Sequence, residues 1–159
     1  MSSLATSLVA RLVASVVNFF TMRAISKTKN MNGSWVYEQI TTESEYRPYI
    51  AMRLRYLALI RINGLEISGA AEKIWESSTE GGEREYTGKN RSTATISGHY
   101  IRNVFGKDEI VIHLNESGHG RNYSTQQIIN FIDDNQLEGR FTSTAANQTG
   151  TCKWFRRTT

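Results

Sequence analysis

The chain of 159 residues has little of what most small sites are built from: one cysteine, Cys152, one proline, Pro48, and three histidines. A single thiol excludes an intrachain disulfide and is typical of a protein from a reducing compartment. A zinc or iron–sulfur centre would have to draw on that cysteine and the scattered histidines, so we expect no metal and no cofactor.

Acidic residues are missing from the start of the chain, where Glu38 is the first of 15. The first thirty residues hold four of the 19 basic residues: Arg11, Arg23, Lys27 and Lys29. The net charge of +4 therefore belongs to this leader, and the 15 basic and 15 acidic residues that follow it balance. A neutral body disfavours a nucleic-acid groove. We expect an amphipathic or membrane helix over residues 1–30 and one globular domain over residues 31–159.

The leader also lacks a long apolar run. Its uncharged stretch from Leu12 to Met22 is about eleven residues, whereas a helix needs about twenty to cross a bilayer. A narrow polar stripe predicts an amphipathic helix, with members Ser3, Ser7, Arg11, Ser15 and Asn18. A spanning helix would bury Arg11, which favours an oligomer whose polar stripes face inward.

Four interpretations of the leader stay open: an anchor in the membrane interface, a spanning helix in an oligomer, a cleaved targeting peptide, and a helix that packs on the body. Arg and Ser without acids are typical of transit peptides. The trailing Lys27 and Lys29 suit a cytoplasmic flank of a membrane segment. Membrane contact through residues 1–30 is the favoured interpretation.

In the body, apolar and polar residues alternate with the period of a strand. Trp35 and Tyr37 share one face of the first run, and Asn63-Gly64 predicts a tight hairpin. Glycines inside strands, at positions 69, 98 and 139, mark bends where a sheet curls. The pattern predicts an all-β fold, an antiparallel closed barrel of about eight strands, with a helical turn only over Gln126 to Asp133.

No motif for a nucleophile or a phosphate loop is present, and neighbouring carboxylates such as Glu72 and Glu76 are typical of a solvated face. We therefore expect a protein that is not an enzyme. Binding is better supported, because small barrels direct alternate side chains into a lumen.

Aromatic rings that stack on bases, combined with guanidinium groups that bind phosphates, suit a nucleotide pocket. The candidate ligand-binding residues are Trp35, Tyr37, Arg53, Arg55, Tyr56, Trp75, Arg102, Arg121, Tyr123 and Trp154. Arg121 belongs to a loop with flanking glycines that resembles a lid. The alternative is that the tryptophans fill the core and the arginines face water.

The opening of the first strand, Gly33-Ser34-Trp35, resembles the Gly-x-Trp start of lipocalins. The late Trp154 and Arg156 would pack across the barrel base as the closing arginine of a lipocalin does. This resemblance implies a barrel that carries a small apolar ligand.

A second resemblance covers more of the chain: a short N-terminal membrane segment, a basic junction, and a minimal barrel. Its patterns are Gly33 to Tyr37, the run around Ile60 to Gly69, and Glu138 to Phe141. This arrangement resembles the membrane-anchored β-barrel effectors of bacterial cyclic-nucleotide antiphage signalling. In that family the barrel binds a cyclic dinucleotide and the assembled anchors disrupt the inner membrane. Its members usually have two transmembrane helices, and this chain has one short segment.

The leading hypothesis from the sequence is a non-enzymatic sensor or effector in antiviral defence. The barrel would bind a cyclic nucleotide second messenger or another small ligand, and residues 1–30 would oligomerise at the membrane. The resemblance implies a homo-oligomer at the bacterial inner membrane with its barrel in the cytoplasm. The alternatives are a lipocalin-like carrier and a structural subunit that docks through its N-terminal helix.

Overall fold

The computed structural model describes residues 9, 11–18, 29–103, 106–118 and 121–157. Residues 11–18 are helical, as the leader pattern predicted, and Leu12 and Val13 on this helix are more than half exposed. Within the described residues, no helix is long and apolar enough to cross a membrane. The remainder of the predicted leader helix lies outside the described residues.

Strands make up most of the described body, and three short 3-10 turns connect some of them. The strands are β1 (Gly33–Glu43), β2 (Arg53–Asn63), β3 (Glu66–Ser78), β4 (Gly82–Glu85), β5 (Thr93–Ile101), β6 (Glu109–Gly118), β7 (Arg121–Phe131), β8 (Gln136–Ser143) and β9 (Gln148–Arg156). The 3-10 turns are η1 (Arg47–Tyr49), η2 (Gly88–Asn90) and η3 (Ala145–Asn147).

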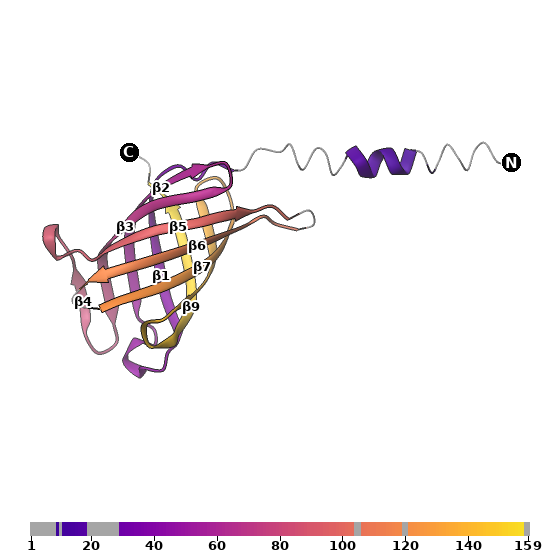
Figure 1. Cartoon of the computed structure of the whole chain (residues 1–159). Helices are drawn as coiled ribbons and strands as arrows, with labels where there is room; N and C mark the ends of the chain where they lie inside the picture. Colours follow the sequence, from indigo (N-terminus) through magenta and orange to yellow (C-terminus); the bar gives the residue numbers. More distant parts are fainter. Residues whose placement is uncertain (1–8, 10, 19–28, 104–105, 119–120, 158–159) are drawn as a thin grey trace.

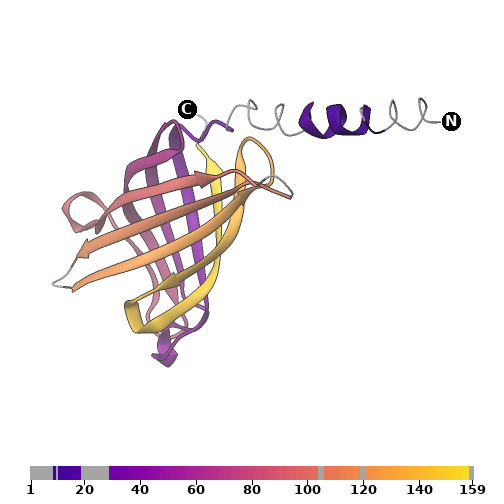
Figure 2. The same ribbon diagram turned by 45° about the vertical axis from the view of Figure 1, so that its right-hand side comes forward.

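Each long strand pairs antiparallel with the next long strand along the chain, and β9 pairs with β1. This last pairing closes the sheet, so no long edge is left unpaired, and the short β4 extends only the end of β3. Eight long strands thus form an up-and-down barrel. Figures 1 and 2 show this arrangement. The predicted antiparallel closed barrel is confirmed.

The inner face of the barrel follows the predicted alternation. In β1, Trp35, Tyr37, Gln39 and Thr41 are buried while the residues between them are more exposed. Alternate side chains of a strand point to opposite faces, so one apolar set fills the lumen. The packed core lies in one half of the lumen, and the other half is hollow.

The glycines inside strands mark places where backbones approach closely. A Cβ added at Gly98 would lie 2.2 Å from the Val111 carbonyl oxygen, and one at Gly139 would lie 2.0 Å from that of Ile128. Neither site has room for a side chain, because a neighbouring strand occupies the space. The prediction that these glycines mark the curling of the sheet agrees with this crowding.

One end of the barrel is closed by an arginine that lies across a tryptophan. The Arg156 guanidinium carbon is 4.4 Å from the ring centroid of Trp35, and its Nη1 donates to the Asn32 carbonyl at 2.8 Å. Nη2 donates to the carbonyl of Asn30, and the Trp35 indole N–H donates to that of Met31. The expected packing of Arg156 across the base is confirmed, and the segment from Asn30 onward belongs to the barrel.

The predicted helical turn over Gln126 to Asp133 is wrong. Residues up to Phe131 belong to β7, where Thr125, Gln127 and Ile129 are buried in strand alternation. In the sequence, two adjacent isoleucines, Ile128 and Ile129, stand between amide residues. The apolar and polar residues therefore do not alternate there, and the strand period could not be recognised. Pairing with β6 and β8 on both sides decides the conformation.

Candidate functional site

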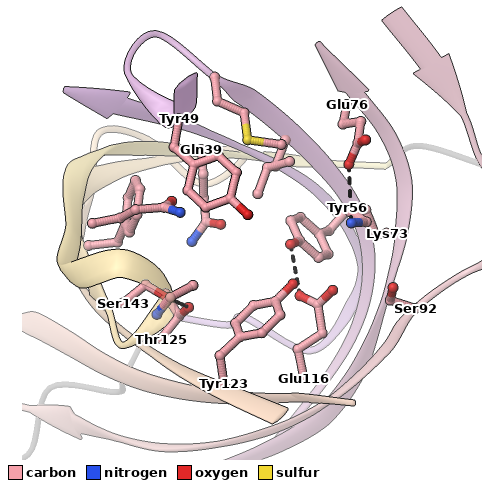
Figure 3. A pocket seen from close by; sticks show the side chains of 15 residues that line it. Gln39, Tyr49, Tyr56, Lys73, Glu76, Ser92, Glu116, Tyr123, Thr125 and Ser143 are labelled. Carbon is pink, nitrogen blue, oxygen red and sulfur yellow. Dashed lines mark hydrogen bonds and ion pairs between the residues drawn. The ribbon is translucent and has the colours of Figure 1, made fainter. Parts of the chain in front are cut away.

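A cavity of about 470 Å³ opens at the end of the barrel opposite the Arg156 closure. Its wall comes from strands far apart in the sequence and from η1 and η3. The lining residues are Gln39, Tyr49, Met52, Leu54, Tyr56, Lys73, Glu76, Ser92, Glu116, Tyr123, Thr125, Phe141, Ser143, Ala145 and Gln148. Figure 3 shows the labelled side chains converging on this space.

A buried carboxylate on β6 organises one side of the cavity. The Tyr56 hydroxyl donates to Glu116 Oε2 at 2.9 Å, and Figure 3 shows the Tyr123 hydroxyl pointing toward the same group. Burial raises the pKa of Tyr56 and of Tyr123, and the neighbouring Glu116 raises both further. Both phenols therefore remain protonated donors at neutral pH.

Two buried polar atoms on the cavity wall have no hydrogen-bond partner among the described residues: Gln39 Nε2 and Glu116 Oε1. Both side chains are 5% exposed. Buried polar groups are nearly always hydrogen-bonded, because each unpaired one costs about 1–3 kcal/mol. One donor and one acceptor thus remain available to whatever occupies the cavity.

A lysine also lines the cavity, but it is already paired. Lys73 Nζ lies 3.2 Å from Glu76 Oε2 and 4.8 Å from the ring centroid of Tyr86. Its side chain is only 11% exposed. Glu116 consequently remains the carboxylate of the cavity without a described cationic partner.

A stack of aromatic rings leads from Tyr56 on the cavity wall into the packed core. Tyr37 lies between Tyr56, at 4.7 Å between ring centroids, and Trp154, at 4.3 Å. The Trp154 indole N–H donates to Gln127 Oε1 at 2.7 Å beneath this stack. Of the sequence-predicted site residues, Tyr56 and Tyr123 line the cavity, whereas Tyr37 and Trp154 support it from below.

Arg53 and Arg55 do not reach the cavity, contrary to the sequence prediction. They lie on the outer wall, where their Nη2 atoms contact the carboxylate of Glu38 at 2.8 and 3.0 Å. Their positions differ by an odd number from that of the inward-facing Tyr56, so the strand alternation directs them outward.

Trp75 also faces outward, because a register shift in the β2–β3 pairing reverses the alternation. Arg55 pairs with Trp75 while the next residue, Tyr56, pairs with Lys73. The extra residue in β3 turns Trp75 to the outer wall, with its ring centroid 4.9 Å from the Arg55 guanidinium carbon. The same shift brings Glu76 to the cavity.

The remaining predicted residues lie elsewhere. Trp35 is fully buried at the closed end, and Arg102 is exposed beyond the end of β5. Arg121 begins β7, and its side chain lies outside what the structure describes. No described group of three or more His, Cys, Asp or Glu side chains is arranged to hold a metal ion.

The sequence prediction missed several residues of the cavity wall. Gln39 follows Trp35 and Tyr37 on the same face, and Glu116 follows Ile112 and Leu114, so alternation alone would have found both. Tyr49 gave no such signal, because it reaches the cavity from η1.

A second hollow adjoins the cavity at the rim. Its volume is about 750 Å³, and Tyr49, Tyr123 and Ala145 line both spaces. Tyr46 lines its outer part, with its ring centroid 4.9 Å from that of Tyr49 in an edge-to-face contact. Tyrosine rings from η1, from the residue just before it and from β7 therefore line the entrance.

Comparison with known proteins gives a fold and no family. No family model and no curated protein matches the chain. A solved structure titled "De novo design of a fluorescence-activating beta barrel" matches with a TM-score of 0.55 and 12% sequence identity. The match covers 80% of this chain and 94% of that chain. The chain is therefore similar to a closed β-barrel of designed origin in fold alone.

Proposed function

We propose that the protein is a non-enzymatic binding protein whose barrel holds a small molecule in the cavity at its open end. The observation that carries this proposal is a pair of buried atoms on the cavity wall, Gln39 Nε2 and Glu116 Oε1, for which no described residue provides a hydrogen-bond partner. A ligand that accepts from the first and donates to the second would remove the cost of burying both. Water alone in the cavity is the competing explanation.

The size and lining of the cavity support a compact ligand with a flat ring. A volume of about 470 Å³ lies in the range of small-molecule sites. Tyr49, Tyr56 and Tyr123 contribute aromatic rings to the wall, and aromatic pairs add about 0.5–1.5 kcal/mol beyond the area they bury. A rigid planar ligand would use these rings at a low entropic cost.

A cyclic nucleotide messenger stays within this proposal as one ligand class, with self-association of the leader at a membrane as the output. Its bases would stack on the tyrosines, and base N–H groups would reach Glu116. Its phosphates would meet Lys73, which is already paired with Glu76. Recognition would thus depend on the bases more than on the phosphates.

An apolar carrier, the lipocalin-like alternative, is supported less well. Met52, Leu54 and Phe141 give the cavity an apolar part. A wholly apolar ligand would nevertheless cover Gln39 and Glu116 without pairing their free atoms, and each would then carry its full desolvation cost.

The test is thermal unfolding and calorimetry of the full chain with three kinds of compound: cyclic di- and trinucleotides, a fatty acid, and polar aromatic heterocycles. A ligand at 100 times its dissociation constant should stabilise the protein by about 2.7 kcal/mol. Ala145→Trp, which fills the entrance, should abolish this shift, and Thr151→Trp on the exposed face of β9 should not.

Stabilisation by the fatty acid alone would favour the carrier. No shift with any compound would contradict the proposal and leave water as the occupant of the cavity.

A further inference from the structure

We infer that Glu116 makes the cavity selective for a planar organic cation whose charged group carries N–H donors, such as an aryl amidinium. This inference rests on the proposed function, because it names the ligand class of the same cavity. The observation behind it is a buried carboxylate that lies among tyrosine side chains. One of its oxygens accepts a hydrogen bond, and the other has no described partner.

The first step is the state of the Glu116 carboxylate. It is 5% exposed, and its Oε2 accepts from Tyr56, whereas Oε1 has no described partner. Removing a carboxylate from water costs several kcal/mol unless an opposite charge or further hydrogen bonds compensate. Among the described side chains, no lysine or arginine pairs with it, so a cationic ligand would supply the missing partner.

The second step is the charge of the whole cavity wall. Among the described lining residues Lys73 is the cation, and two carboxylates, those of Glu76 and Glu116, line the same cavity. Because Glu76 contacts the lysine at 3.2 Å, the charge of Lys73 is largely balanced by Glu76, and Glu116 adds a further negative charge to the wall. An anionic head group would be repelled there, and a cationic one attracted.

The third step is the shape of the ligand. Tyrosine faces attract cations, and Figure 3 shows the side chains of Tyr56 and Tyr123 next to Glu116. A flat amidinium places an N–H donor on Oε1 while its aryl ring lies along the tyrosines. Gln39 Nε2 would donate to an acceptor atom elsewhere on a natural ligand.

The experiment compares three isosteric probes on the full chain by calorimetry: benzamidine as the cation, benzamide as the neutral form, and benzoate as the anion. Benzamidine should bind at least about tenfold more tightly than the other two, because charge-assisted hydrogen bonds are about twice as strong as neutral ones. This ranking is measured on the unmodified protein and does not depend on the folding of any variant.

A matched pair of variants then tests whether Glu116 causes the preference for benzamidine. Glu116→Gln should lower the affinity for benzamidine at least about tenfold and leave that for benzamide unchanged. Glu138→Gln, on the exposed face of β8 beside Lys153, removes a carboxylate outside the cavity and should leave both affinities unchanged.

Binding of benzoate more tightly than benzamidine would overturn the inference, as would an unchanged benzamidine affinity in Glu116→Gln. If a neutral or anionic compound binds and Ala145→Trp blocks it, the ligand-binding function stands and the charge selectivity fails. If none of the three probes binds but a compound of the thermal unfolding test does, the charge selectivity fails and the ligand-binding function stands. If no compound of either set binds, both fail.

Discussion

Arg156 shows how one side chain holds several parts of the barrel together. Its guanidinium lies over Trp35 and donates to the carbonyls of Asn30, Asn32 and Asp134. These contacts join the end of β9 to the segment before β1 and to the β7–β8 loop. Since Trp35 is fully buried beneath it, the guanidinium also covers that end of the core.

We predict that Arg156→Ala lowers the free energy of unfolding by about 1–3 kcal/mol, from the lost cation–π contact and hydrogen bonds. Arg156→Lys should recover little of this, because an ammonium lacks the planar fork that reaches several carbonyls. Urea denaturation followed by tryptophan fluorescence measures the change.

Arg140→Ala is the control, because this arginine is exposed on β8. Equal losses for Arg140→Ala and Arg156→Ala would contradict the role assigned to Arg156.

At the scale of the element, the register shift between β2 and β3 decides which side chains face the cavity. One extra residue in β3 turns Trp75 outward and Glu76 inward. A regular strand would place Trp75 in the lumen and leave Lys73 without its partner. The bulge therefore sets the charge of the cavity wall.

The close contact of β5 with β6 at Gly98 gives a second prediction at this scale. Gly98→Ala should lower the free energy of unfolding by about 1–3 kcal/mol or more, because overpacking forces the backbones apart. The new Cβ would meet the Val111 carbonyl at 2.2 Å, and that oxygen belongs to the backbone of β6.

Ser97→Ala, at the adjacent exposed position, serves as the control in the same thermal unfolding experiment. A stable Gly98→Ala with an unchanged melting temperature would refute the packing argument.

At the scale of the molecule, the cavity entrance and the last two residues of the leader, Lys29 and Asn30, lie at opposite ends of the barrel. Lys29 contacts Asp134 and the ring of Phe131, and Arg156 holds Asn30 at the closed end. The cavity opens at the other end, where residues of η1 and η3 line it. A surface bound by the leader would therefore lie at the end of the barrel opposite the cavity entrance.

The buried tyrosine hydroxyls and the buried cysteine thiol predict that the protein loses stability at alkaline pH. Burial raises the pKa of Tyr37 and Tyr56 well above 10.0, raises that of Tyr123, and raises that of Cys152 from 9.0 to about 12. Above pH 9 the unfolded chain releases protons that the folded barrel retains. The free energy of unfolding is therefore unaffected by the ionisation of these groups below pH 9, and it falls as the pH rises above that value.

Urea denaturation at pH 8, 9, 10 and 11 should show this decline, and absorbance at 295 nm should show that the buried tyrosines ionise only with unfolding. In Cys152→Ala the decline between pH 9 and 10 should be smaller. Constant stability from pH 8 to 11 would contradict the prediction.

Alternation made much of the fold predictable. Trp35, Tyr37 and Tyr56 were expected on inward faces, glycines at 98 and 139 were expected at bends, and Asn63-Gly64 was expected at a hairpin between β2 and β3. The cavity was less predictable. Arg53 and Arg55 were placed in it although they share a face opposite Tyr56, and Tyr49 enters it from a short turn.

The sequence by itself determined the strand period, the all-β fold class and the separation of a basic leader from a neutral body, because these depend on local alternation and charge. Tertiary structure decided which end is filled and which is hollow, how the bulge turned Trp75 outward, and that Glu116 meets Tyr56 across the lumen. These features depend on pairing between distant strands, since closure brings residues sixty positions apart to 2.9 Å.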